Sequence, residues 1–393
     1  MKYLITGGCG FIGSHLAEKI LDEGNDVFVI DDLSTGNLDN VSRIMGNKKF
    51  HLVIDTILNS IILEEMLRES DFVFHLAGAN RPKEEAEFMK VNYGLTATLL
   101  GLLKKHRNTC PVMVSSSIQA RLDNSYGKSK KAGEDLMLEY AKETGAKVLI
   151  YQFPNVFGKW CKPNYNSVVA TFCHNIANDL PITVNDSNAM LSLVYIDDVI
   201  SELLNALKGN PTQENSFFCG IKPVYEIKLG EIVDLLYSFK ESRNDLTVPN
   251  MEDAFTKKLY ATYLSYLPVN GFSYPLKMNV DSRGSFTEFI KTPERGQFSI
   301  NISKPGIVKG NHWHSTKNEK FLVVSGKGVI RFRKVGFDEV LEYYVSGDKL
   351  EVVDIPPGYT HNIENLGDSD MVTVMWANEP FNPENTDTYG EPV

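Results

Sequence analysis

Three histidines and one glutamate in the last quarter of the chain have the spacing of a metal-binding site. His312 and His314 flank a tryptophan, Glu319 follows shortly after them, and His361 lies in the later run PPGYTHNIEN. Imidazole and carboxylate groups together suit one divalent metal, and iron, manganese or nickel would be bound by such ligands as well as zinc. A purely structural metal would use the same four ligands, so their spacing leaves the role of the metal open.

A glycine-rich turn near the N-terminus has the spacing of a dinucleotide-binding site. Gly7, Gly10 and Gly13 follow a short apolar run and begin a helical pattern, so the backbone there can approach a pyrophosphate closely. Asp31, at the end of the next apolar run, can accept hydrogen bonds from an adenosine ribose. It would repel a 2′-phosphate, which favours NADH over NADPH. The cofactor contacts that we expect are Gly7, Gly10, Phe11, Ile12, Gly13, Asp31, Asp32, Asp55, Leu76, Ala77 and Lys130.

A tyrosine and a lysine in the middle of the first half form a candidate catalytic pair. Tyr126 and Lys130 stand four residues apart, on one face of a helix, where the ammonium is expected to lower the pKa of the phenol. We expect Tyr126 to act as general acid or base at a carbonyl or carbinol oxygen, while Lys130 orients the nicotinamide ribose. A serine from the run VSSSIQA at residues 114–120 would share the substrate carbonyl.

The elements that must position these groups differ between the two halves of the chain. In the first half, short apolar runs alternate with helical patterns, which predicts a doubly wound, Rossmann-type parallel sheet closed by a helix at residues 229–242. From residue 272 onward, strand-like runs separated by Gly, Asp and Pro predict an antiparallel barrel or jelly roll. We therefore predict an α/β domain over residues 1–265 and an all-β domain over residues 266–393, with a loose tail over residues 378–393.

The composition restricts the class of protein. Fifty acidic residues against 40 basic ones give a net charge of −10, which argues against nucleic acid or an anionic membrane as a partner. The chain has no apolar run of about 18 residues, and its glycine-rich start is unlike a signal peptide, so we expect a cytoplasmic protein with no membrane partner. Its five cysteines form no CxxC pair, as expected for reduced thiols.

The motifs of the first half resemble the extended short-chain dehydrogenase/reductase family. TGGCGFIGSHL, VIDDLSTG, HLAG, YGKSK, PNVFG and VYIDDV occur here in the order of that family. Its members act mostly on nucleotide-sugars, so the resemblance implies a UDP-sugar or related substrate. It also implies that Ser117 is the catalytic serine, with Ser116 as the next choice, and that Asn155 contacts the substrate.

The motifs of the second half are similar to both cupin motifs, and MNVDSRGSFTEF at residues 278–289 resembles the opening of sugar-nucleotide 3,5-epimerases. The fusion of the two halves resembles the bifunctional enzymes of capsular polysaccharide biosynthesis. This resemblance implies that the cupin binds zinc and epimerises C3 of a UDP-2-acetamido-2,6-dideoxy-4-hexulose, and that the reductase domain reduces C4. The product would be UDP-2-acetamido-2,6-dideoxy-L-talose, a precursor of UDP-N-acetyl-L-fucosamine.

This pair of reactions is chemically coherent. A 4-keto group acidifies the hydrogen on C3, and a Lewis-acidic metal can stabilise the resulting enediolate. Arg283 is expected to pair with the diphosphate of the substrate. The residue that removes the C3 proton is left unassigned. Exposed sheet edges in small barrels often pair, so we also expect a homodimer through the cupin strands.

Two alternative functions remain open, and the first of them arises from the choice of cofactor. The resemblance implies NADPH, whereas Asp31 favours NADH and no arginine follows it before Arg43. The first 70 residues are more similar to nucleotide-sugar epimerases and decarboxylases. One alternative is therefore a redox-neutral 4-epimerase, dehydratase or decarboxylase that retains NAD beside a structural cupin. The other is a non-catalytic sugar-binding or regulatory protein, against which the intact serine, tyrosine and lysine count.

Overall fold

The computed structural model describes all residues except 293 and 385. The chain divides into two compact units, one formed by Met1–Tyr237 with Ala254–Leu267 and the other by Ser238–Asp253 with Pro268–Val393. The segment Ser238–Asp253, which the sequence places in the first domain, thus belongs to the second unit. A β-bridge between Thr247 and Lys291 ties it there.

The core of the first unit is a seven-stranded sheet whose paired strands are parallel. The strand order β3-β2-β1-β4-β5-β6-β9 reverses direction beside β1, and ligands of such sheets bind at this reversal point. The predicted doubly wound fold is confirmed. The strands are β1 (Lys2–Thr6), β2 (Asp26–Asp31), β3 (Phe50–Ile54), β4 (Phe72–His75), β5 (Val112–Ser117), β6 (Val148–Phe153) and β9 (Phe218–Cys219).

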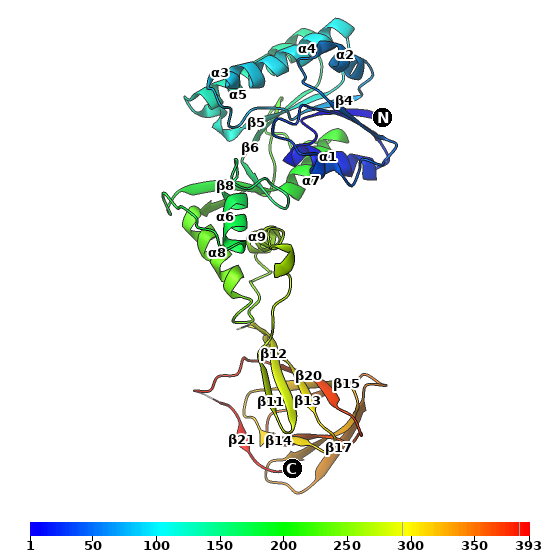
Figure 1. Cartoon of the computed structure of the whole chain (residues 1–393), viewed down its shortest axis with the longest axis vertical. Coiled ribbons are helices and arrows are strands. Elements are labelled where there is room, and N and C mark those ends of the chain that lie inside the picture. Colours follow the sequence, from blue (N-terminus) through cyan, green and yellow to red (C-terminus); the bar gives the residue numbers. More distant parts are fainter. Residues whose placement is uncertain (293, 385) are drawn as a thin grey trace. The chain divides into compact units, whose positions relative to one another are not determined.

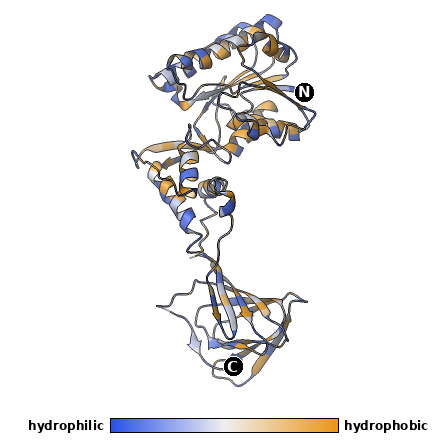
Figure 2. Ribbon diagram, viewed as in Figure 1, coloured by the Kyte–Doolittle hydropathy of each residue, from blue (hydrophilic) through white to orange (hydrophobic). Residues whose placement is uncertain are grey.

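Helices cover both faces of this sheet. Figure 1 shows α1 and α7 on one face, with α2, α4 and α5 on the other. Leu99, Leu103 and Met137 pack onto sheet residues Leu4 and Val114, and the burial of each large apolar side chain contributes roughly 1.5–3 kcal/mol. Figure 2 shows hydrophobic residues, coloured orange, along the strands of this sheet. The helices are α1 (Phe11–Asp22), α2 (Ser60–Arg68), α3 (Ala86–Phe88), α4 (Gly94–His106), α5 (Ser125–Thr144) and α7 (Ile196–Leu207).

Three further strands form a second, smaller sheet, and three further helices are described with it. The strands β7 (Asn155–Phe157), β8 (Met190–Tyr195) and β10 (Tyr225–Lys228) form a small sheet of their own. The predicted helix at residues 229–242 is α8 (Leu229–Glu241), but α9 (Ala254–Leu264) packs against α6 (Val168–Ala177) after it. The buried threonines Thr256 and Thr262 interrupt the apolar stripe of α9, which hides this helix from the sequence pattern. None of the described helices is long and apolar enough to cross a membrane.

The second unit consists of two antiparallel sheets, ordered β11-β12-β13-β20-β15-β18 and β17-β16-β19-β14-β21. Phe321, Ile330, Phe332, Ile363 and Met371 form its apolar core. The predicted antiparallel all-β fold is confirmed. Its strands are β11 (Met278–Asp281), β12 (Gly284–Thr292), β13 (Gly296–Ser303), β14 (Val308–Trp313), β15 (Glu319–Ser325), β16 (Lys327–Lys334), β17 (Val340–Ser346), β18 (Val352–Ile355), β19 (Tyr359–Asn365), β20 (Met371–Ala377) and β21 (Tyr389–Gly390).

The prediction of a loose tail over residues 378–393 is wrong. The short strand β21 pairs with β14, and the ring of Tyr389 stacks on Trp313 with ring centroids 4.5 Å apart. Arg333 donates to the Glu391 carboxylate at 2.7 Å, which holds the last residues against β16. The Pro- and Asn-rich composition conceals this order because the contacts come from residues far away in the sequence.

Candidate active sites

The first unit contains a cleft of about 1210 Å³ where β1, β2, β4 and β5 end. This position is the reversal point of the sheet, where dinucleotides bind in such folds. The cleft is lined by every residue that the sequence predicts for the cofactor, the catalytic group and Asn155, namely Gly7, Gly10, Phe11, Ile12, Gly13, Asp31, Asp32, Asp55, Leu76, Ala77, Ser117, Tyr126, Lys130 and Asn155.

The glycine turn leaves no room for side chains. Gly7 has a φ of 72°, and a Cβ there would lie 2.9 Å from the backbone nitrogen of Ala77. A Cβ on Gly13 would lie 2.4 Å from the Gly7 carbonyl oxygen, so the start of α1 packs directly on the turn. The first N–H groups of α1 therefore face the cleft over bare backbone, an arrangement suited to binding a pyrophosphate.

Asp31 is held in place by the backbone around it. It is buried at the end of β2, where its Oδ2 accepts from the N–H of Cys9 and its Oδ1 accepts from the N–H of Leu33, each at 2.8 Å. Burial raises the pKa of Asp31, while these two donors partly offset that rise. Each carboxylate oxygen keeps a further lone pair, so the group can still accept a ribose hydroxyl.

The two neighbouring acidic residues are also oriented by hydrogen bonds. Asp32 accepts from the N–H of Ser34 at 2.9 Å. Asp55 accepts from the N–H of Thr56 and from the side-chain amide of Asn59, both at 2.7 Å. These contacts hold both carboxylates at the edge of the cleft with their acceptor character preserved.

Arg43, the first arginine after Asp31, also lines the cleft. Its guanidinium donates to Glu18 at 2.8 Å and lies 4.4 Å from the ring centroid of Trp160. An ion pair and an aromatic contact therefore already engage this cation.

Tyr126 and Lys130 lie on the cleft side of α5. The Lys130 ammonium donates to the Ser115 carbonyl at 3.1 Å, and burial lowers its pKa to about 8. The Tyr126 hydroxyl donates to Asn80 Oδ1 at 3.2 Å. Burial raises the pKa of Tyr126, and Ser117 partly opposes this rise. The lowering of this pKa that we expected from Lys130 is therefore not seen, because the net change is upward. A phenol that keeps its proton near neutral pH is suited to protonating a carbonyl oxygen during reduction.

The structure separates the two candidate serines. Ser116 is buried and donates to the Glu134 carboxylate at 2.5 Å, and Gln152 donates to the same oxygen. Ser117 instead accepts from the N–H of Gln119 at 3.2 Å. Its hydroxyl also opposes the rise in the pKa of Tyr126 that burial causes. Ser117 is therefore better placed to share a substrate carbonyl with the phenol.

Two loops supply cleft residues that sequence reasoning missed. They carry the runs HLAGANRP at residues 75–82 and GKWCKPNYNSV at residues 158–168, in which polar and aromatic residues are dense. That density was the available signal, but loops lack the regular spacing that reveals helices and strands. The additional lining residues include Asn80, Arg81, Trp160, Lys162 and Tyr165.

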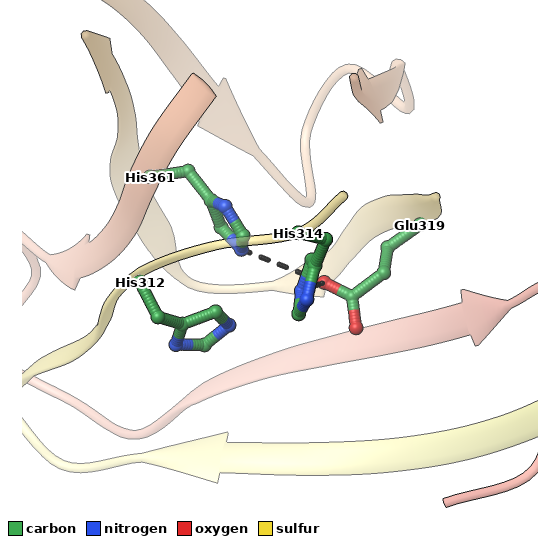
Figure 3. Close-up of side chains that lie close together, drawn as sticks. All are labelled: His312, His314, Glu319 and His361. Carbon is green, nitrogen blue, oxygen red and sulfur yellow. Dashed lines mark ion pairs between the residues drawn. The ribbon is translucent and has the colours of Figure 1, made fainter. Parts of the chain in front are cut away.

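The four predicted metal ligands converge in the second unit. His312 lies on β14, His314 follows that strand, Glu319 begins β15 and His361 lies on β19. One potential ligand atom of each lies within 4.8 Å of the others, and Figure 3 shows the four side chains around a common space. The Nε2 atoms of His314 and His361 are each 3.5 Å from Glu319 Oε2.

These four side chains fit a divalent cation. His314 Nε2, both ring nitrogens of His361 and Glu319 Oε2 are buried and have no hydrogen-bond partner within the described parts of the chain. Leaving such an atom unpaired costs about 1–3 kcal/mol, which a bound cation would offset. Burial and the other imidazoles lower the pKa of His312 to about 4, so its ring is neutral and able to bind a metal. Burial alone would raise the pKa of Glu319, but the histidines and Lys317 outweigh it and keep the carboxylate ionised.

Asp387 lies in the segment that was predicted to be a loose tail. It supports the group formed by His312, His314, Glu319 and His361, which we call the metal-type cluster. Its carbonyl oxygen accepts from Nδ1 of His314, which directs Nε2 of that ring toward Glu319. Its carboxylate accepts from the N–H groups of Ser315, Thr316 and Lys317, and these donors lower the pKa of Asp387 below its ordinary value. Such partners of ligand histidines fix the tautomer and orientation of the ring.

Beside the cluster lies a cavity of about 690 Å³ lined by His312, Glu319 and His361. Arg283 lines it too, but its exposed guanidinium is already paired with the Asp281 carboxylate, with an Nη2–Oδ2 distance of 2.7 Å. A diphosphate would therefore have to compete with Asp281 for this arginine.

Comparison with known proteins places the first unit in a family. A model of the NAD dependent epimerase/dehydratase family matches residues 3–218, more than half of the chain. The chain belongs to this family. The match includes the glycine turn, Asp31 and the Tyr126–Lys130 pair, and membership supports a nicotinamide cofactor. The polysaccharide biosynthesis C-terminal domain matches residues 279–389, which contain the metal-type cluster.

Full-length relatives within the family share both units. The crystal structure of the capsular polysaccharide assembling protein CapF from Staphylococcus aureus is 54% identical, with a TM-score of 0.87 and complete coverage of both chains. A UDP-2-acetamido-2,6-beta-L-arabino-hexul-4-ose reductase from Pseudomonas aeruginosa is 41% identical over 99% of this chain and 98% of its own. The predicted resemblance to the capsular enzymes is therefore confirmed.

A more distant structure shares the fold. The UDP-glucuronic acid 4-epimerase from Bacillus cereus, solved with UDP-glucuronic acid and NAD, is 22% identical with a TM-score of 0.56. It covers 68% of this chain and 99% of its own length. At this level of identity the likeness shows the fold alone.

The contacts of Asp387 generate a prediction about metal binding. We expect Asp387→Ala to weaken zinc affinity about 10- to 100-fold, because the segment that orients His314 loses its anchor on residues 315–317. Competition with a chromophoric chelator measures this change. Asp368→Ala, at an exposed aspartate of the same unit, is the matched control and should retain the wild-type affinity. Equal affinities in the two variants would contradict the role of Asp387.

Proposed function

We propose that the chain is a bifunctional nucleotide-sugar enzyme of capsular polysaccharide biosynthesis. The second unit epimerises C3 of UDP-2-acetamido-2,6-dideoxy-4-hexulose, and the first unit reduces C4 to give UDP-2-acetamido-2,6-dideoxy-L-talose. The observation that carries this proposal is the presence in one chain of a Tyr126–Lys130 cleft and a buried His₃Glu cluster. The names of the two full-length relatives support the substrate class and the pathway.

The reduction follows from the residues of the cleft. The bound nicotinamide cofactor supplies the hydride to C4. Tyr126, whose pKa is raised by burial, donates its proton to the C4 oxygen, and Ser117 donates a hydrogen bond to the same oxygen. Lys130 stabilises the phenolate that remains and is placed to contact the ribose of the cofactor. Asn155, which lines the cleft beside these groups, is proposed to contact the sugar.

The epimerisation follows from the cavity of the second unit. A bound divalent cation, for which zinc is the first choice, supplies a Lewis acid for the ketone oxygen. His312, His314, Glu319 and His361 would hold that cation, while Arg283 lies at the cavity for the diphosphate. Since the same C4 ketone acidifies C3 and accepts the hydride, epimerisation has to precede reduction.

The redox-neutral alternative rests on Asp31. A carboxylate that binds the ribose of NAD also suits a 4-epimerase, dehydratase or decarboxylase that retains its cofactor. That enzyme would show no net oxidation of NADH, whereas the bifunctional enzyme consumes one reduced cofactor for each C4 carbinol formed.

Substitution of Tyr126 tests the assignment of the two reactions. The protein is incubated in D₂O with the 4-hexulose and either NADH or NADPH, and the product is analysed by NMR. Wild type should give deuterium at C3 and a carbinol at C4. Tyr126→Phe should lose C4 reduction about 100- to 10,000-fold and keep C3 exchange, because the phenol lies in the other unit.

The control is Tyr237→Phe, which changes an exposed tyrosine of the first unit and should behave as wild type. Wild-type rates of C4 reduction in Tyr126→Phe would contradict the role of the phenol. The absence of reduction by the wild type with both cofactors would favour the redox-neutral enzyme.

Cofactor choice provides a second test. We propose NADH as the preferred reductant and expect its kcat/KM to exceed that of NADPH at least about tenfold, or about 1.4 kcal/mol, because Asp31 repels a 2′-phosphate. Asp31→Asn removes this charge and should narrow the ratio, whereas Asp22→Asn on α1 should leave it unchanged. Steady-state absorbance of the reduced nicotinamide, measured under the same conditions with each cofactor, gives the ratio. A wild-type preference for NADPH would contradict the proposed role of Asp31.

The exposed edge of the second unit supports a homodimer. All four residues of the edge strand β11 are exposed, including Met278 and Val280 at 55% and 69%. Unpaired strand edges of this kind favour pairing with a second copy. Sedimentation velocity at micromolar concentration should show a dimer, and Val280→Lys should shift it toward monomer. A wild-type protein that sediments as a monomer would refute this proposal.

A further inference from the structure

The base that removes the C3 proton is the missing part of the proposed epimerisation. A general base has to lie in the substrate cavity beside the metal-type cluster. Apart from the cluster itself, the charged residues that line this cavity are Asp281, Arg283, Lys309 and Lys317. These four side chains differ in what already engages them.

Three of the four are poorly suited to accept a proton. Asp281 is bound by Arg283, whose guanidinium lowers the pKa of the carboxyl and makes it a weak base, and an arginine stays charged. Lys317 lies 3.3 Å from the Oε1 atom of Glu319, so its ammonium is paired with a proposed metal ligand.

Lys309 is held differently, on β14 with its side chain half-buried. Its Nζ donates to Asn301 Oδ1 and to the Ile302 carbonyl, both at 2.8 Å. A neutral amine has two N–H groups and one lone pair, and these two acceptors match its two N–H groups. The remaining position on Nζ is left for the cavity that Lys309 lines.

The surroundings fix this arrangement. Asn301 is buried, and its side-chain nitrogen donates to Ser303 Oγ at 3.1 Å, so its oxygen faces Lys309. Burial lowers the pKa of Lys309; Arg283 lowers it further, while Asp281 opposes the change. The other charged or titratable groups of the cavity are Lys317 and the cluster of His312, Glu319 and His361.

We propose that Lys309 is the general base that removes the C3 proton of the 4-ketosugar. This assignment rests on the proposed function of the second unit. The C3–H bond breaks as an N–H bond forms on Lys309, and the electron pair moves into the C3–C4 bond while the C4 oxygen takes the negative charge. Lys309 then releases the proton to solvent, and a solvent proton added to the other face of C3 restores the ketone.

The exchange of C3 hydrogen for deuterium tests this step without reduction. The full-length protein loaded with zinc is incubated with the 4-hexulose in D₂O in the absence of any nicotinamide cofactor, and exchange is followed by NMR. Lys309→Met and Lys309→Arg should both lose exchange at least about 100-fold, since neither side chain offers an amine. Lys304→Met, at an exposed lysine between β13 and β14, should exchange as wild type.

Each contrary result has a distinct meaning. Wild-type exchange in Lys309→Met would overturn any catalytic role for this lysine, and exchange retained in Lys309→Arg alone would replace the base with a purely electrostatic role. Lack of exchange by the wild type would overturn the proposed epimerase function together with this assignment. Zinc content and thermal unfolding of both variants establish that the fold and the metal site are retained.

The pH dependence of the C3 exchange rate distinguishes a catalytic lysine from a structural one. A lysine with only a structural role would not give this rate a pH dependence that disappears in Lys309→Arg. The base is the neutral amine, so the exchange rate of the wild type should rise with pH through the pKa of Lys309. Because burial lowers that pKa, the midpoint should lie below the ordinary value of 10.5. The rise should be absent from the residual exchange of Lys309→Arg. A midpoint at or above 10.5, or the same rise in both proteins, would contradict the proposal.

Discussion

A buried polar atom has to find a partner, and this constraint organises both sites of the protein. In the first unit, backbone groups satisfy the buried charges: two N–H groups hold Asp31 and a carbonyl holds Lys130. In the second unit, atoms of His314, Glu319 and His361 are left without hydrogen bonds among the described residues. The first arrangement pre-orients groups for a nicotinamide cofactor, while the second offers the unpaired donors that a cation would need.

The same constraint separates residues of equal chemical type. Ser116 and Ser117 are neighbours in the chain. The hydroxyl of Ser116 is engaged by a buried carboxylate, whereas that of Ser117 opposes the rise in the pKa of Tyr126. Lys309 and Lys317 share a cavity, yet one donates to neutral oxygens and the other pairs with a carboxylate. Lys317 is thus engaged by a charged partner, whereas the two neutral acceptors of Lys309 leave one position of its Nζ for the cavity.

One ketone links the chemistry of the two units in the proposed function. While C4 is a carbonyl, the hydrogen on C3 is acidic and a base can exchange it; after hydride transfer that acidity is lost. The reductase step therefore fixes whatever configuration the epimerase has produced. This order follows from the substrate and requires no particular placement of the two units.

The chain itself determined the features that depend on local spacing. The glycine turn, the Tyr126–Lys130 pair and the His312–His314 run lie within a turn of helix or a few residues of strand, so their spacing predicts which groups share a face. The parallel and antiparallel sheets follow from the length and periodicity of the apolar runs. Only the tertiary structure decided which groups are engaged by distant partners. Asp387 beside His314, Asn80 beside Tyr126 and Glu18 beside Arg43 come from other helices or loops, and no periodicity links such positions in the sequence.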